Sequence, residues 1–95
     1  RSLAINGYLD ITLPISNNGK IRKPVISFKG LPVENLDETF IFDLEDEIDE
    51  ICKTFSLQNK KQEFNLIEAL KQNCKRIVRE KTGKKPYTRI NLARI

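Results

Sequence analysis

The sequence predicts an α+β domain with the element order ββααβ, in which two helices cover one face of a three-stranded sheet. Two observations define the strands and one defines the helices. Apolar and polar residues alternate in residues 8–15 and 87–95, as in strands that bury one face. An Asn-Gly pair after the first alternation predicts a hairpin turn. Between the second strand and the last one, apolar residues recur at helical spacing in residues 40–55 and 61–81.

The first strand spans Tyr8 to Ile15, and its inward residues are Leu9, Ile11, Leu13 and Ile15. Because Pro14 has no N–H to donate, its side of the strand should face an edge or a bulge. After the Asn18-Gly19 turn, the second strand is expected from about Ile21 to Lys29, with Ile26 and Phe28 inward. Replacing Gly19 with Val would disturb this register, because Val would be forced into positive φ. Gly30-Leu31-Pro32 ends the strand, and residues 33–39 read as a polar connection.

The first helix is expected to begin near Phe40, and its apolar stripe consists of Leu44, Ile48, Ile51, Cys52 and Phe55. Its first two turns carry the carboxylates of Asp43, Glu45, Asp46, Glu47, Asp49 and Glu50. The second helix is expected from about Lys61 to Lys81, with Asn59 as N-cap and Gly83 as left-handed C-cap. Its predicted inward residues are Phe64, Ile67, Leu70, Cys74, Ile77 and Val78.

The closing strand places Thr88, Ile90 and Leu92 on the face that meets the helices. Val25, Tyr87 and Ala93 fall on the opposite face, so we expect them to form a subunit contact. A chain of 95 residues has room for one domain and one core. Because it starts at Arg1 without an initiator Met, we interpret it as a piece of a longer protein.

The absence of histidine limits the chemistry that this chain can carry out. It excludes Ser-His-Asp and Cys-His nucleophile systems within the chain and removes the commonest metal ligand. Cys52 and Cys74 lie on apolar helical faces, so we interpret them as core residues; a disulfide between them would require the helices to pack side by side. No apolar run approaches the ~20 residues that span a bilayer, which indicates a cytoplasmic protein without a membrane partner.

Two charged segments resemble binding motifs but have simpler explanations. The acidic residues 43–50 spread around a helix instead of converging on one point, so we interpret them as a solvated helix face, not a cation site. The segment Lys81 to Lys85 follows a helix instead of preceding one and lacks the two-glycine spacing of a phosphate loop.

The distribution of charge suggests an anionic partner. Residues 1–33 carry five basic and one acidic side chain, residues 34–58 carry one and nine, and residues 59–95 carry eleven and three. A basic stripe lies on the second helix and continues into the closing strand: Lys71, Lys75, Arg76, Arg79, Lys84, Lys85 and Arg89. Such a stripe matches a nucleic-acid backbone, a water-exposed helix face or an acidic protein partner. Tyr87 is the only aromatic residue expected near it, which argues against a base-stacking platform.

Four short segments carry a family resemblance when they are taken in order. They are Arg1-Ser2-Leu3-Ala4-Ile5-Asn6-Gly7, then Tyr8 to Ile15 with Asn18-Gly19-Lys20, then Val25 to Pro32 ending in Gly-Leu-Pro, and finally Ile77 to Pro86 ending in Lys-Lys-Pro. In this order the chain resembles the C-terminal domain of ribonuclease J, a family of metallo-β-lactamase/β-CASP ribonucleases. The resemblance covers nearly the whole chain.

The resemblance implies a parent enzyme that hydrolyses RNA with two metal ions, usually zinc, in 5′-to-3′ exonucleolytic and endonucleolytic modes of RNA processing and decay. Its ligands are His and Asp residues of the preceding domains, and none can be assigned to this chain. In the family, this domain supports assembly into dimers or tetramers and is expected to help hold RNA near the catalytic channel.

We therefore expect residues 1–95 to form a single non-catalytic C-terminal domain of a ribonuclease J-like enzyme, without a cofactor of its own and with zinc in the parent catalytic domain. Its expected roles are oligomerisation and RNA contact. The alternative is a free-standing RNA-binding module that uses the basic face of the second helix.

Overall fold

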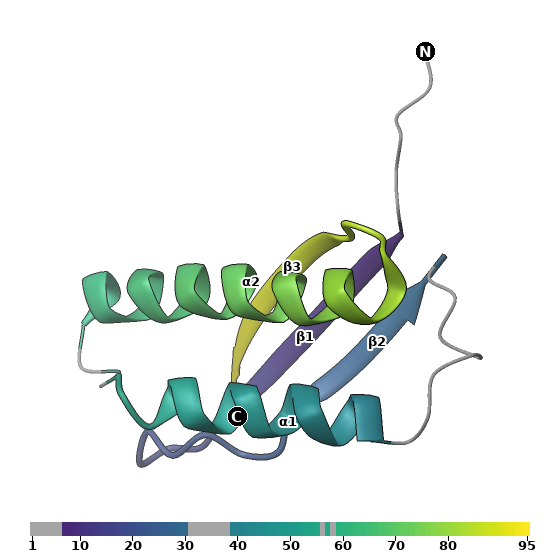
Figure 1. The fold of residues 1–95 in the computed structure, drawn as a ribbon. Coiled ribbons are helices and arrows are strands. Elements are labelled where there is room, and N and C mark those ends of the chain that lie inside the picture. The colour runs from purple at the N-terminus through teal and green to yellow at the C-terminus, as the bar shows by residue number, and fades with distance from the viewer. Residues whose placement is uncertain (1–6, 31–38, 56, 58) are drawn as a thin grey trace.

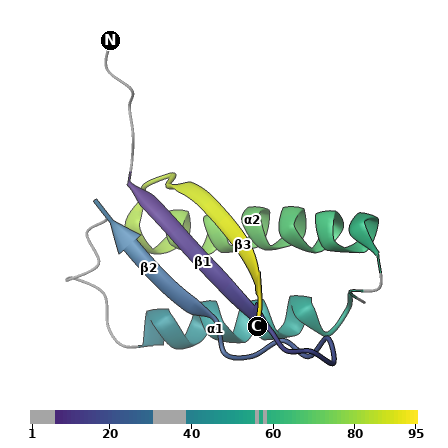
Figure 2. The same cartoon turned by 180° about the vertical axis from the view of Figure 1, so that it is seen from behind.

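Two helices lie side by side across one face of a three-stranded sheet in the computed structural model, which describes residues 7–30, 39–55, 57 and 59–95 (Figure 1). The elements are β1 (Tyr8–Ile15), β2 (Val25–Lys29), α1 (Thr39–Cys52), α2 (Lys60–Thr82) and β3 (Tyr87–Arg94). No described element covers the other face of the sheet, as the view from behind shows (Figure 2). The predicted order ββααβ and the two-layer α+β architecture are therefore confirmed.

The first strand of the chain is the central strand of the sheet, whose order is β2-β1-β3. β2 pairs with β1 in the antiparallel sense, from Tyr8↔Lys29 to Thr12↔Val25. β3 pairs with β1 in the parallel sense, from Tyr8↔Tyr87 to Ile15↔Arg94. Parallel neighbours require a long crossover connection, and α1 and α2 form this connection on one face of the sheet.

The second strand starts at Val25, four residues later than the sequence pattern predicts. Ile21 makes only an isolated bridge with Ile15. Pro24 explains the late start, because it has no N–H for the ladder and restricts the backbone of the residue before it. A turn forms at the expected place, but its central residues are Asn17 and Asn18 and not Asn18 and Gly19, because the Gly19 N–H donates to the Ser16 carbonyl at 2.9 Å. Gly19 follows them with a φ of 81°.

Pro14 lies beyond the last regular pair of β1 with β2, which is Thr12↔Val25. Its carbonyl accepts a hydrogen bond from the Arg22 N–H at 2.8 Å, so this side of Pro14 faces the irregular segment before β2. The expectation that Pro14 faces an interruption of the ladder is confirmed.

The core lies between the sheet and the two helices. It consists of Leu9, Ile11, Leu13 and Ile15 from β1, Phe40, Leu44 and Ile48 from α1, Leu66, Leu70, Cys74 and Val78 from α2, and Ile90 from β3. Phe64 was expected to point inward, but it is 62% exposed. Leu66 is buried in its place, and two residues along a helix correspond to a rotation of about 200°.

Both predicted caps of α2 are present. The Asn59 side chain accepts a hydrogen bond from the Gln62 N–H at 2.9 Å. Gly83 has a φ of 76°, and its N–H donates to the Arg79 carbonyl at 2.8 Å. Neither α1 nor α2 is long and apolar enough to cross a membrane.

Replacing Gly83 with Ala should lower the free energy of unfolding by about 1–2 kcal/mol, because a residue with a Cβ is strained at this φ. A Cβ at this position would have no heavy atom within 4 Å apart from its chain neighbours, so steric crowding should not add to the cost. Gly83→Asn serves as the control, because Asn tolerates the left-handed conformation better than Ala. Urea denaturation would measure both variants, and equal losses would argue against strain as the cause.

Candidate nucleic-acid interface

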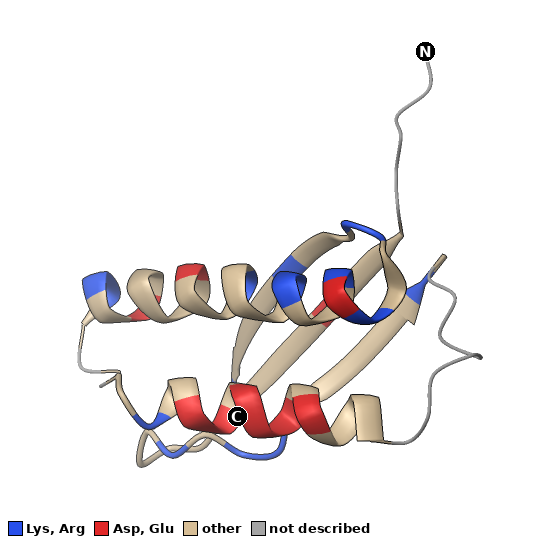
Figure 3. Ribbon diagram, viewed as in Figure 1, with Lys and Arg blue, Asp and Glu red and all other residues tan. Residues whose placement is uncertain are grey.

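The seven basic residues predicted to form one stripe fall into groups with different surroundings. Figure 3 shows that the acidic residues of α1 lie opposite the C-terminal half of α2, where several of these basic residues are found. Lys71 forms an ion pair with Glu68 on its own helix at 3.8 Å. Whether a basic residue is available to a partner therefore depends on its distance from the carboxylates of α1 and α2.

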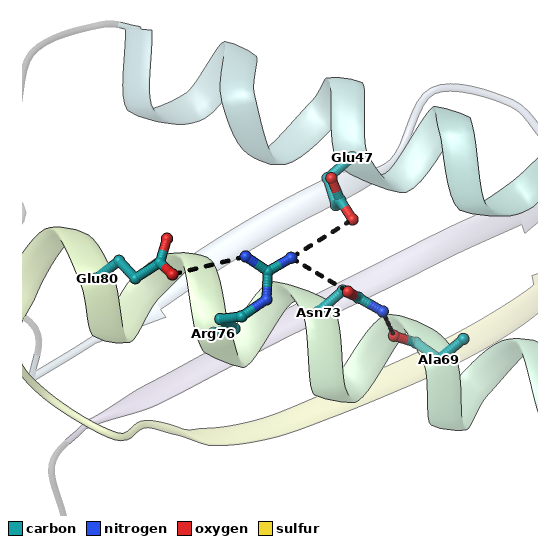
Figure 4. A network of polar contacts seen from close by, with 5 residues as sticks. All are labelled: Glu47, Ala69, Asn73, Arg76 and Glu80. Carbon is teal, nitrogen blue, oxygen red and sulfur yellow. Dashed lines mark hydrogen bonds and ion pairs between the residues drawn. The ribbon is translucent and has the colours of Figure 1, made fainter.

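Arg76 is held between the two helices (Figure 4). Its guanidinium lies 3.9 Å from the Glu47 carboxylate of α1 and 3.6 Å from the Glu80 carboxylate of α2. It also donates a hydrogen bond to the Asn73 side chain at 3.2 Å, and the Asn73 amide in turn donates to the Ala69 carbonyl at 2.8 Å. These carboxylates neutralise much of the charge that Arg76 would offer to a phosphate.

The acidic residues of α1 lie on a largely exposed helix face, and some of them form ion pairs there. Besides Glu47, Asp43 lies 3.6 Å from Lys81 of α2, while Lys53, which follows α1 directly, lies 3.2 Å from Asp49. The helix begins at Thr39, so none of these carboxylates lies in its first turn. The helix dipole acts mainly on charges in the first turn, so it contributes little to the stability of α1.

Four basic residues form a cluster that has no ion pair with any described carboxylate: Lys75, Arg79, Lys84 and Lys85. All four are exposed. A shallow hollow of about 390 Å³ lies beside them, lined by Gln72, Lys75, Arg76, Arg79 and Lys85. We call these four residues the basic cluster.

Arg89, the seventh predicted residue, lies on the uncovered face of the sheet and not on the helical surface. Its Nε donates a hydrogen bond to the Asn91 side chain at 3.3 Å, and the Asn91 amide donates to the Asp10 carboxylate at 2.9 Å. Pro86, Tyr87 and Thr88 connect this position to the basic cluster along the chain. The predicted stripe therefore bends from the helical layer onto the sheet.

Two tyrosines lie next to each other on this uncovered face. Tyr8 and Tyr87 are register partners on β1 and β3, and their ring centroids are 5.8 Å apart with an interplanar angle of 77°. The sequence-based view that Tyr87 is the only aromatic residue near the basic residues was therefore wrong. The alternation of β1 places Tyr8 on the uncovered face, but only the parallel pairing of β1 with β3 brings it beside Tyr87.

The three residues predicted to form a subunit contact lie on the expected face but in different rows of the sheet. Tyr87 is opposite Tyr8, Val25 is opposite Thr12, and Ala93 is opposite Pro14. Rows four residues apart along a strand are separated by about 13 Å. Val25 and Ala93 therefore lie toward one end of this face and Tyr87 toward the other.

The family model of the ribonuclease J C-terminal domain matches residues 1–94. The chain belongs to this family. No curated protein and no solved structure matches the chain. The match agrees with the resemblance read from the four segments. Of those segments, residues 1–6 and 31–32 lie outside the described part of the structure. Most of the polar connection at 33–39 lies outside it as well.

In the ranges that the structure describes, no group of three or more His, Cys, Asp or Glu side chains could hold a metal ion. The two cysteines are free thiols, with Cys74 buried and Cys52 half-buried. Burial, together with the nearby Asp49, raises the pKa of Cys52 to about 11, and burial with Glu47 and Cys52 nearby raises that of Cys74 to about 12. Both are therefore protonated at neutral pH and behave as core residues.

A double-mutant cycle should detect the contact between Glu47 and Arg76 in this ribonuclease J C-terminal domain. Glu47→Gln and Arg76→Gln should show a coupling free energy of about 0.2–1 kcal/mol in urea denaturation, because the pair is partly exposed. The coupling should fall in 1 M salt, where the screening length is ~3 Å.

Asp46 supplies the control for this cycle, because this exposed α1 carboxylate has no ion pair with any described residue. Asp46→Asn combined with Arg76→Gln should show no measurable coupling. Equal coupling for the two pairs would mean that Arg76 responds to the overall charge of α1 and not to Glu47.

Proposed function

We propose that this chain is a non-catalytic accessory domain of a cytoplasmic ribonuclease J-like enzyme of RNA processing and decay, and that it holds RNA through the basic cluster. The observation that carries the proposal is that Lys75, Arg79, Lys84 and Lys85 have no ion pair with any described carboxylate. Unpaired cations at neighbouring positions attract a phosphate backbone and release its counterions.

The acidic helix supports a direction for this contact. Asp43 and Glu47 of α1 form ion pairs with Lys81 and Arg76 of α2. RNA that approached from the α1 side would meet carboxylates and be repelled. We infer that it approaches from the C-terminal end of α2 and the loop that carries Lys84 and Lys85.

In this proposal, the preceding domains of the parent protein hydrolyse RNA, in exonucleolytic and endonucleolytic modes and with zinc as the metal. The accessory domain would then act by binding alone. It would raise the local concentration of RNA beside the catalytic channel, and its contribution would weaken as salt screens the basic cluster.

Replacing Lys75 and Arg79 with Gln should weaken the binding of single-stranded RNA by about 25-fold at 0.1 M salt, because each lost phosphate contact costs about 5-fold there. The slope of log K against log salt should become shallower by about 1.4. Fluorescence anisotropy with a labelled 12-nucleotide RNA, between 50 and 300 mM salt, would measure both quantities.

Lys60→Gln with Lys61→Gln is the matched control for this experiment. It removes the same charge from exposed positions at the other end of α2. Equal losses for the two double variants would contradict the basic cluster as the site and indicate a response to net charge alone.

Self-association into a dimer or tetramer is a second candidate function. It is favoured by the uncovered sheet face, on which Val25 is 60% exposed. Apolar side chains on an uncovered sheet face are a common basis for subunit contacts. The subunit contact predicted from the sequence, at Val25, Tyr87 and Ala93, remains a prediction.

If the uncovered face forms this contact, Val25→Glu with Ala93→Glu should abolish concentration-dependent association in sedimentation velocity, since two carboxylates would be buried between subunits. Phe42→Glu, at a similarly exposed position on α1, is the control and should leave association unchanged. A chain that sediments as a monomer at every concentration up to about 100 μM, where a contact of micromolar Kd would form, would rule out this second function for the isolated domain.

A further inference from the structure

A second hollow lies on the uncovered face of the sheet, and no residue of the basic cluster lines it. Its volume is about 470 Å³, and the side chains that line it on the exposed side are Tyr8, Asp10, Ser27, Lys29, Tyr87 and Arg89. These residues come from all three strands and lie in two neighbouring rows of the register. The hollow therefore combines two aromatic rings with two cations and one carboxylate.

We propose that this hollow binds an unstacked base of single-stranded RNA against the Tyr8–Tyr87 pair. The proposal rests on the proposed function, because it takes RNA as the polymer that the basic cluster holds. Base stacking on aromatic side chains is the usual way in which proteins bind single-stranded RNA without a duplex groove.

The tyrosine pair has a geometry that suits a planar ligand. Tyr8 is 42% exposed and Tyr87 is 63% exposed, although both sit on the same rigid sheet. Their rings are nearly perpendicular, at 77°, so they form a corner in which a base stacked on one ring meets the other at nearly a right angle. Neighbouring parallel strands hold the two tyrosines in register, so their side chains should lose little conformational entropy when a base binds.

The charges around the corner favour a nucleotide over an uncharged aromatic ligand. Lys29 flanks Tyr8 in the same row, and Arg89 lies two residues after Tyr87 on the same face. Among the described residues, Asp10 is the one carboxylate that lines the hollow, and it already accepts a hydrogen bond from the Asn91 amide. A phosphate beside the base would therefore meet two cations, while the remaining acceptor sites of Asp10 suit the amino group of a base.

The hollow is also continuous with the basic cluster along the chain. Lys85 lines the other hollow, the one beside the basic cluster. Tyr87 follows Lys85 by two residues, which is at most about 7 Å of extended chain. A strand of RNA that leaves the helical surface at Lys85 would meet Tyr87 next and Arg89 after it. This continuity favours RNA over a second copy of the chain as the occupant of the tyrosine end of the sheet.

The two tyrosines supply a direct spectroscopic test, because the chain has no other tyrosine and no tryptophan. Fluorescence excited near 280 nm therefore reports on this pair alone. Adding a 12-nucleotide single-stranded RNA should quench it, after correction for RNA absorbance, whereas a blunt duplex of the same sequence should quench it much less.

Binding measurements with substituted chains test the same site. Tyr8→Ala and Tyr87→Ala should each weaken single-stranded RNA binding by about 5- to 150-fold, while Tyr8→Phe and Tyr87→Phe should stay within about 2-fold because they keep the ring. Phe64→Ala is the matched control, since Phe64 is as exposed as Tyr87 but lies on α2. Circular dichroism would confirm that each variant folds.

The outcomes separate this proposal from the proposed function. Normal affinity in both Ala variants, with the loss in Lys75→Gln/Arg79→Gln retained, would overturn stacking and leave the basic cluster as the RNA site. Loss of self-association in Tyr87→Ala, without any change in RNA affinity, would assign the face to a second copy of the chain and also overturn the proposal. Selective loss of single-stranded RNA binding, with an unchanged salt slope, is the result that we expect.

Discussion

The parallel pairing of β3 with β1 is the interaction on which the rest of this structure depends. It joins the last strand of the chain to the first strand over eight register pairs, from Tyr8↔Tyr87 to Ile15↔Arg94. Without it, only the β1–β2 pair would remain, and a two-stranded sheet is marginally stable in water unless it packs against a helix. Because the pairing is parallel, the chain between the strands must cross the sheet, and α1 and α2 bury Leu9, Ile11 and Leu13 as they do so.

The same pairing determines where the two candidate binding surfaces lie. It places Tyr87 beside Tyr8 and turns Arg89 onto the uncovered face, while the α2 C-terminus stays on the helical layer. The Gly83 cap and the short segment to Tyr87 connect these two surfaces at one corner of the molecule. The basic residues between Lys75 and Arg89, which follow one another closely in the sequence, therefore lie on two different faces of the fold.

Charge is arranged in this domain by the antiparallel packing of the two helices. α1 carries six carboxylates and no Lys or Arg, whereas α2 carries seven basic and three acidic residues. Where the helices meet, Glu47 and Asp43 pair with Arg76 and Lys81. The remaining basic residues at the far side of α2 keep their full charge, so the domain is electrostatically polarised although its net charge is only +4.

The sequence by itself determined the number, type and order of the elements, because hydrophobic spacing and capping residues act locally. The alternation of Tyr8–Ile15, the Asn59 cap and the Gly83 cap needed no knowledge of the fold. The sequence pattern placed Phe64 inward and the start of β2 at Ile21, and both errors arose where apolar spacing alone was followed without weighing Leu66 or Pro24. Only the tertiary structure decided the strand order, the partners of Arg76 and the meeting of Tyr8 with Tyr87. These depend on pairing between residues far apart in the chain, and local spacing contains no information about which distant strand or helix a side chain will face.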